Sequence, residues 1–322
     1  MSQILILGAG LSGLVAAREL HKAGHEVVVV DKGRGVGGRM ATRRVVGGTF
    51  DHGAQFFTAR SDEFRALLDE WQREGVAGEW FRGYPSPTNE KPNDAHPRFR
   101  GESGMTGIAK HLAQGLDVRL GEEIAALKFE QGRWNTVSQS GAYFNADELI
   151  LTAPVPQSLI LLANSGVELP SEAKNTLESL RYEPCFAVMA QLEGPSQIPF
   201  PGALYVNGEV LWWIADNFQK GISARQGSIT IHSGGGWARD HYNDAENEVA
   251  EALLEESAPY LGSKVESFSV RRWRYSKPEN PLEIGCLRVG ELNLSFAGDI
   301  FMGAKIEGAV LSGLSAAKGI KD

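Results

Sequence analysis

A glycine-rich turn near the start of the chain constrains the fold more than any other feature. Gly8-Ala9-Gly10-Leu11-Ser12-Gly13 directly follows an apolar run over residues 4–7, and Asp31 ends the next apolar run. A GxGxxG turn between a strand and a helix, with an acid about twenty residues further on, is the fingerprint of a dinucleotide site. We therefore predict a strand–helix–strand unit over residues 3–31 that binds a dinucleotide.

The residues of this turn have separate predicted roles. Gly8 allows the tight turn, Gly10 lets the backbone approach a pyrophosphate, and Gly13 lets helix and strand pack closely. The helix that starts here, with Ser12 in its first turn, directs free amide groups at the pyrophosphate. Asp31 is predicted to accept hydrogen bonds from the ribose of the adenosine half.

A second glycine turn, Gly37-Gly38-Arg39, follows. We expect Arg39 to bind a phosphate of the cofactor, because guanidinium groups bind phosphate oxygens bidentately. Pairing of Arg39 with a carboxylate is the alternative. The local cluster of Arg34, Arg39, Arg43 and Arg44 favours a bound anion over a nucleic acid, since the net charge is −8 and there is no long basic run.

Size and composition are those of a soluble globular protein. The 322 residues predict two connected lobes. Two cysteines far apart, Cys185 and Cys286, indicate reduced thiols in a cytoplasmic protein. The first strand begins at about residue 3, so we expect no signal peptide. The most apolar stretch, 149–163, is too short and too interrupted by proline to span a membrane.

Two further site types are not expected. The seven histidines show no ligand spacing with cysteine or carboxylate, so no metal site is predicted. Residues 234–236 are all glycine but show no following helical pattern or placed acid. The chain therefore has one dinucleotide fingerprint, and a nicotinamide would enter as a substrate.

Periodicity gives the remaining organisation. Residues 32–60 and 81–104 are predicted as loops, the second lining a substrate site. Helices are predicted over 62–74, 241–257 and 306–320, and a hairpin turns at Gln131-Gly132. Strands are expected at 147–154, 185–193, 203–206, 210–215, 228–233, 266–274 and 292–297.

These motifs resemble the flavoproteins of the amine oxidase and phytoene desaturase superfamily. The likeness rests on the GxGxxG turn, the following acid, Gly37-Gly38-Arg39, and Gly298-Asp299 before a helix. Within the superfamily the chain most resembles the renalases, especially bacterial ones. The segments that carry this likeness are 31–40, 51–60, 104–106 and 306–309.

The resemblance implies an α/β fold with two domains. One is a Rossmann-like FAD-binding domain, made of residues 1–80, 105–155 and 285–322. The other is a substrate domain built on a mostly antiparallel sheet, made of residues 81–104 and 156–284. FAD is expected to be non-covalent, because residues 301–304 offer no cysteine or histidine for attachment.

The resemblance also implies an activity. Renalases oxidise dihydronicotinamide dinucleotides that carry hydride at the wrong ring position, and pass the electrons to oxygen with release of hydrogen peroxide. The alternatives are an amine oxidase or carotenoid-type desaturase of the same superfamily, or a non-catalytic flavin-binding protein. No nucleic-acid or membrane partner is expected, and the oligomeric state stays open.

Candidate site residues follow from these patterns. The isoalloxazine region is expected to contact Gln55 and Phe56, the adenine the backbone at Ile124, and the ribityl or phosphate region Asp299. The set of predicted cofactor-binding residues is Gly8, Gly10, Ser12, Gly13, Asp31, Lys32, Gly38, Arg39, Gln55, Phe56, Ile124, Asp299 and Ile306.

The predicted substrate pocket contains Phe186, His232, Trp273 and Tyr275. Phe186 comes from the resemblance. For His232 and Trp273, a structural role in the core is an equal or better alternative. No essential acid–base residue is expected, because aromatisation of a dihydropyridine drives hydride transfer and leaves positioning as the main task.

Overall fold

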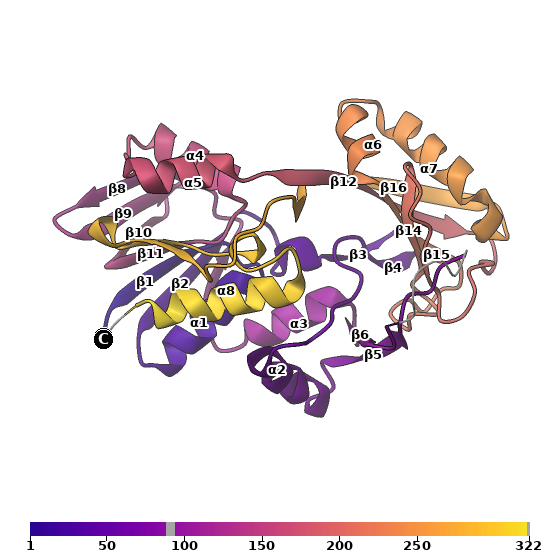
Figure 1. Cartoon of the computed structure of the whole chain (residues 1–322), viewed down its shortest axis with the longest axis horizontal. Helices are drawn as coiled ribbons and strands as arrows, with labels where there is room; N and C mark the ends of the chain where they lie inside the picture. The colour runs from indigo at the N-terminus through magenta and orange to yellow at the C-terminus, as the bar shows by residue number, and fades with distance from the viewer. Residues whose placement is uncertain (88–93, 321–322) are drawn as a thin grey trace.

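Two β-sheets of different kinds organise the chain (Figure 1). The computed structural model describes residues 1–87 and 94–320. One lobe is built on a largely parallel sheet near both chain ends, and the other on an antiparallel sheet near β12 to β16. The expected two-lobe α/β class is confirmed.

The sheet of the first lobe has six strands in the order β17–β18–β11–β1–β2–β7. All neighbours pair in parallel except β17 with β18. The strands are β1 (Gln3–Leu7), β2 (Glu26–Asp31), β7 (Asp117–Leu120), β11 (Glu148–Leu151), β17 (Leu287–Val289) and β18 (Leu294–Phe296).

Strand β1 shows how both faces of this sheet are covered. Ile4 and Ile6 lie in one hydrophobic cluster and Leu5 and Leu7 in another, as alternation along a strand requires. The first cluster is closed by helices α1 (Leu11–Lys22), α2 (Asp62–Arg73), α3 (Met105–Leu112) and α8 (Ile306–Lys318). The second is closed by α4 (Val155–Asn164), α5 (Ser171–Ser179) and the antiparallel strands β8 (Ile124–Glu130), β9 (Arg133–Ser138) and β10 (Tyr143–Ala146).

Helices α4 and α5 are a correction to the sequence analysis, which predicted no helix between residues 155 and 180. Short apolar runs do not distinguish helix from buried strand, and a proline in the first turn of α4 favours the helix. Both helices share a cluster with Leu5 and Leu7 of the parallel sheet, whereas the predicted substrate domain starts at residue 156.

The second lobe is a five-stranded antiparallel sheet in the order β13–β14–β15–β12–β16. All five of its strands match runs expected from the sequence. They are β12 (Tyr182–Leu192), β13 (Ala203–Tyr205), β14 (Leu211–Asp216), β15 (Ser228–Ser233) and β16 (Val265–Pro278). One face packs against α6 (Gly235–Asp240) and α7 (Glu246–Leu261).

The single helix predicted over 241–257 is wrong in its start and end. Two helices occur instead, and the turn between them is held by His241 Nδ1, 2.6 Å from a carboxylate oxygen of Asp244. Helix α6 also begins directly after Gly234, where no helical pattern was expected.

Both predicted loops contain hairpins. Residues 32–60 hold β3 (Thr42–Val45) and β4 (Gly48–Asp51), and residues 81–104 overlap β5 (Ala77–Arg82) and β6 (Pro97–Gly101). Part of the second predicted loop, 88–93, lies outside the described residues. Over the described ranges, no helix combines the length and apolarity needed to cross a membrane.

Candidate cofactor and substrate site

A cavity of about 1540 Å³ joins the two sheets. Its lining runs from the glycine turn after β1 to the cavity face of β15 and β16. Pockets for single small ligands usually measure about 300–1,000 Å³. The cavity is therefore larger than a pocket for a single drug-sized ligand.

The three fingerprint glycines lie in the environments that their predicted roles require. Gly8 has a φ of +120°, which favours glycine, and a Cβ on Gly13 would stand 2.1 Å from the Gly8 carbonyl oxygen. A Cβ on Gly10 would meet no atom within 4 Å, so the backbone there faces open space. The geometry separates two glycines needed for folding from one that leaves room for a ligand.

The amino terminus of α1 closes this end of the cavity. Its N-cap, Gly10, offers no side chain to cap the helix, and the Ser12 hydroxyl is buried with no hydrogen-bond partner in the described structure. Free amide groups at a helix start attract anions. The turn is thus preorganised for a phosphate group.

Asp31 sits at the carboxyl end of β2 and is held by the backbone. Its carboxylate accepts hydrogen bonds from Ala9 N at 2.7 Å and Gly33 N at 2.6 Å. Lys32 is exposed and lies 3.8 Å from Glu123. Both residues line the cavity, as does Ile124.

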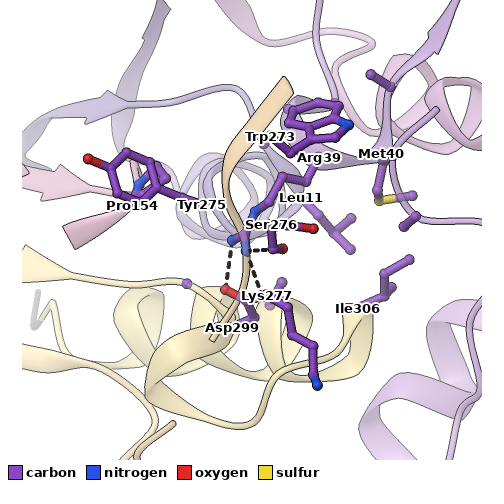
Figure 2. A pocket seen from close by; sticks show the side chains of 18 of the residues that line it. Leu11, Arg39, Met40, Pro154, Trp273, Tyr275, Ser276, Lys277, Asp299 and Ile306 are labelled. Atoms are coloured by element: carbon purple, nitrogen blue, oxygen red, sulfur yellow. Dashed lines mark hydrogen bonds and ion pairs between the residues drawn. The ribbon is translucent and has the colours of Figure 1, made fainter. Parts of the chain in front are cut away.

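Arg39 and Asp299, each expected to contact the cofactor, contact each other (Figure 2). Two guanidinium nitrogens donate to the two carboxylate oxygens at 3.0 and 2.7 Å, and one also donates to the Ser276 carbonyl at 3.2 Å. Burial opposes the charge of Arg39, but Asp299 outweighs it and raises the pKa of the guanidinium. The pair bridges the second glycine turn and the segment before α8.

Gln55 and Phe56 line the cavity, as do Gly38 and Ile306. The Gln55 amide nitrogen donates to the Asp51 carbonyl at 2.6 Å, and its side-chain oxygen is buried without a partner in the described structure. Phe56 packs against Trp213 at a centroid distance of 5.6 Å. Gln55 therefore has an acceptor free to meet a ligand.

One wall of the cavity is formed by His52, which follows β4, His232 on β15 and Trp273 on β16. The His52 carbonyl accepts from Trp273 Nε1 at 2.8 Å and lies 3.2 Å from His232 Nε2, and the His52 ring stacks on Trp273 at 5.3 Å. Burial, with help from Arg271 and Arg43, lowers the pKa of His52 to about 4. Burial likewise lowers the pKa of His232 to about 4, so both imidazoles are neutral at pH 7.

Tyr275 lines the cavity two residues beyond Trp273, on the same face of β16. Its ring lies 5.6 Å from that of Tyr182 in an edge-on arrangement. Burial raises the pKa of Tyr182 to about 12, so this phenol stays protonated. Three of the four predicted pocket residues therefore reach the cavity.

Phe186 does not reach the cavity, and its expected substrate contact is corrected. It is fully buried on the opposite face of β12, where it packs against Trp237 and Tyr242. Its neighbour Cys185 lines the cavity instead. Side chains alternate along a strand, so an error of one position moves a residue to the other face.

Comparison with known proteins decides the family. The chain matches the NAD(P)-binding Rossmann-like domain over residues 6–71 and the flavin containing amine oxidoreductase family over residues 69–321. The second match covers well over half of the chain. The protein belongs to the flavin-containing amine oxidoreductase family.

Relatives of this family resemble the chain over its full length. Renalase from Mus musculus is 25% identical, with 100% of this chain and 99% of renalase aligned. Cyclohexylamine oxidase from Brevibacterium oxydans superposes with a TM-score of 0.75 at 15% identity, covering 99% of this chain and 98% of that one. Putrescine oxidase bound to putrescine gives 0.73 at 17% identity, covering 99% and 98%. The last two likenesses concern the fold.

FAD is the cofactor of this amine oxidoreductase, and the cavity fits it. The hydroxyl of Ser12 and the side-chain oxygen of Gln55 are buried polar atoms awaiting a partner. A Cβ on Gly10 or Gly298, which both line the cavity, would enter open space. These features mark a cradle along the cavity floor that a large ligand would fill.

A buried ion pair behind the cavity was not found from the sequence. The Lys220 ammonium, fully buried, lies 2.6 Å from Asp51 Oδ2 and donates to the Gln55 carbonyl at 2.6 Å. Asp51 also accepts from Met105 N at 2.9 Å. Asp51 falls in the segment 51–60 noted for its resemblance, but nothing near Lys220 in sequence signals its role.

One possible metal-ligand group lies outside the cavity. Within residues 1–87 and 94–320, the only such grouping of histidine, cysteine and carboxylates is Glu70 on α2, Glu74 directly after α2, and His111 near the end of α3. Sequence spacing could not show it, because two helices distant in sequence bring these residues together. None of them lines the FAD cavity.

Proposed function

We propose that this flavoprotein oxidises misreduced dihydronicotinamide dinucleotides, the 2-dihydro and also the 6-dihydro isomers of NAD or NADP. The products are NAD(P)⁺ and hydrogen peroxide. Bound FAD would accept the two electrons of the hydride, and oxygen would reoxidise the flavin. The observation that carries the proposal is a cavity that extends from the glycine turn after β1 to His52, His232 and Trp273, in a chain similar to renalase from end to end.

The proposed division of the cavity follows its lining. FAD would lie from Gly10 and Asp31 past Arg39 and Asp299 to Gln55. The Ser12 hydroxyl and the start of α1 would hold its pyrophosphate, since both offer donors without a partner in the described chain. The flavin ring would then face the wall of His52, His232 and Trp273.

The substrate-side residues would act by positioning. The neutral imidazoles of His52 and His232 and the ring of Trp273 present flat, uncharged surfaces to a reduced nicotinamide. The reaction needs no base, because loss of hydride leaves an aromatic ring without release of a proton. A chain built for this task needs orientation and exclusion of competing donors.

Amine oxidation is the second candidate, and one observation favours it. Tyr205 and Trp213 line the cavity and pack edge to face at 4.5 Å, with Phe56 beside them. Aromatic rings grouped in this way can present an amine to a flavin.

Anaerobic stopped-flow mixing of the purified yellow protein separates the candidates. Four donors are compared: 2-dihydro-NAD, 6-dihydro-NAD, ordinary NADH and a simple amine such as cyclohexylamine. We expect rapid bleaching of the flavin by the misreduced isomers and little by NADH or the amine. Bleaching by amines alone would replace the proposal with amine oxidation. Retention of FAD with no bleaching by any donor would indicate a binding protein.

A further inference from the structure

The arginines of this chain divide into two groups by their partners. Most have a carboxylate, carbonyl or hydroxyl partner, as Arg39 has in Asp299 and Arg288 in Glu148. Five have none among the described residues. Four of these five line the large cavity, and the fifth, Arg44, lines a separate hollow; the cavity four are Arg34, Arg43, Arg60 and Arg271.

Arg43 and Arg271 come from different elements, and both line the cavity together with His52. Arg43 lies on β3 and Arg271 on β16, and the charges of both act on the His52 imidazole. The Arg271 guanidinium carbon lies 5.4 Å from the centre of the Trp273 ring. Both side chains are exposed yet line the cavity, which places them at its mouth.

We propose that Arg43 and Arg271 form an anion site that holds the phosphates of the dinucleotide substrate at the mouth of the cavity. This inference rests on the proposed function. A misreduced dinucleotide has an uncharged reduced ring at one end and a diphosphate at its centre. The ring would pass between the flavin and the His52–Trp273 wall, and the diphosphate would remain beside the two guanidinium groups, which bind phosphate oxygens bidentately.

The phosphates of FAD are a poorer match for these two arginines. The fingerprint glycines and the start of α1 would form the pyrophosphate site of the cofactor, and they belong to other elements of the cavity lining than β3 and β16. Arg39, the arginine expected to serve the cofactor, is already paired with Asp299 on the cofactor side. Arg43 and Arg271 adjoin His52 and Trp273, where the substrate would enter.

The test compares a charged and an uncharged substrate on holoenzyme variants. Dissociation constants are measured by anaerobic flavin reduction for 2-dihydro-NAD and for 2-dihydronicotinamide riboside, which lacks phosphate. We expect Arg43→Gln and Arg271→Gln each to weaken the binding of 2-dihydro-NAD about tenfold, because each removes one charge-assisted contact. The dissociation constant of the riboside should change less than about twofold.

Arg44→Gln is the matched control. It removes the same charge from the neighbouring position of β3, where the side chain lines the separate hollow. The dissociation constants of both substrates should stay as in the wild-type protein. Equal weakening of dinucleotide and riboside, unchanged affinity for both, or loss of bound FAD in the Arg43 and Arg271 variants would overturn the anion site.

Calorimetric titration of the FAD-loaded protein with ADP-ribose tests the site without catalysis. ADP-ribose carries the diphosphate but no nicotinamide. Binding to the wild type and the Arg44 variant, with about tenfold weaker binding to the other two, supports the site even if no dihydronicotinamide reduces the flavin. Absence of binding to the wild type overturns it, whatever the fate of the proposed function.

Discussion

The two walls of the cavity are built on opposite principles. The cofactor side is shaped by backbone: Gly8 turns the chain, Gly13 admits the helix, and Gly10 leaves space. The proposed substrate side is shaped by side chains from separate strands, with His232 and Trp273 both contacting the carbonyl of His52. Backbone recognition is encoded in consecutive residues, whereas side-chain recognition depends on strand register and on contacts between distant segments.

The largest expected effect concerns the ion pair that joins the two sides. Lys220→Met should lower the free energy of unfolding by about 3–5 kcal/mol, because it leaves Asp51 buried without its cation. Urea unfolding of the holoprotein measures this. Asp51→Asn combined with Lys220→Met should recover part of the loss.

The control for that change is Lys128→Met, whose lysine is 67% exposed and pairs with Glu130 on β8. It should alter stability by less than about 0.5 kcal/mol. If the two lysine variants unfolded at the same urea concentration, the buried pair would not couple the two sides.

The fingerprint glycines should separate folding from binding. Gly13→Ala should destabilise the apoprotein by about 1–3 kcal/mol, since the new Cβ would overlap the Gly8 carbonyl oxygen. Gly10→Ala should leave apoprotein stability nearly unchanged and weaken FAD binding about tenfold or more, because its Cβ enters space reserved for ligand. Thermal unfolding of apoprotein and FAD titration measure the two effects. A stable, FAD-saturated Gly10→Ala protein would contradict the assignment.

The two neutral histidines should make the free energy of unfolding fall at acid pH. His52 and His232 have pKa values lowered to about 4, below the ordinary 6.5. Between these values the unfolded chain binds more protons than the folded one, so stability is full above pH 6.5 and falls as pH drops toward 4. At pH 5 the loss should be on the order of 1–2 kcal/mol per imidazole.

Unfolding measured from pH 7.5 to 5 checks this dependence. His232→Gln should reduce the slope by about half, since one of the two neutral imidazoles is removed. His21→Gln, which replaces an exposed ring near the end of α1, should leave the slope unchanged. A flat profile for the wild-type protein would show that the two histidines are not held neutral.

The smallest effect tests the register of β12. Phe186→Leu should cost about 1 kcal/mol of stability through lost packing against Trp237 and Tyr242, with KM for 2-dihydro-NAD unchanged. Trp273→Leu, on the cavity face of β16, should raise KM instead. A raised KM in the Phe186 variant would return that residue to the substrate pocket.

The contrast between the walls also explains what the sequence could and could not predict. The parallel sheet, the three fingerprint glycines and the strands of the second sheet follow from local pattern, since each depends on adjacent residues. Helices α4 and α5 were missed because a short apolar run fits strand or helix. Lys220 was missed because its role depends on Asp51, a contact across 169 positions of sequence. Phe186 was misplaced by one residue of register.

The Arg39–Asp299 pair has a consequence for the protein before it binds FAD. Because each partner already neutralises the other, the polypeptide has no uncompensated charge here that only its coenzyme could satisfy. Folding of the polypeptide and binding of FAD can then be separate events.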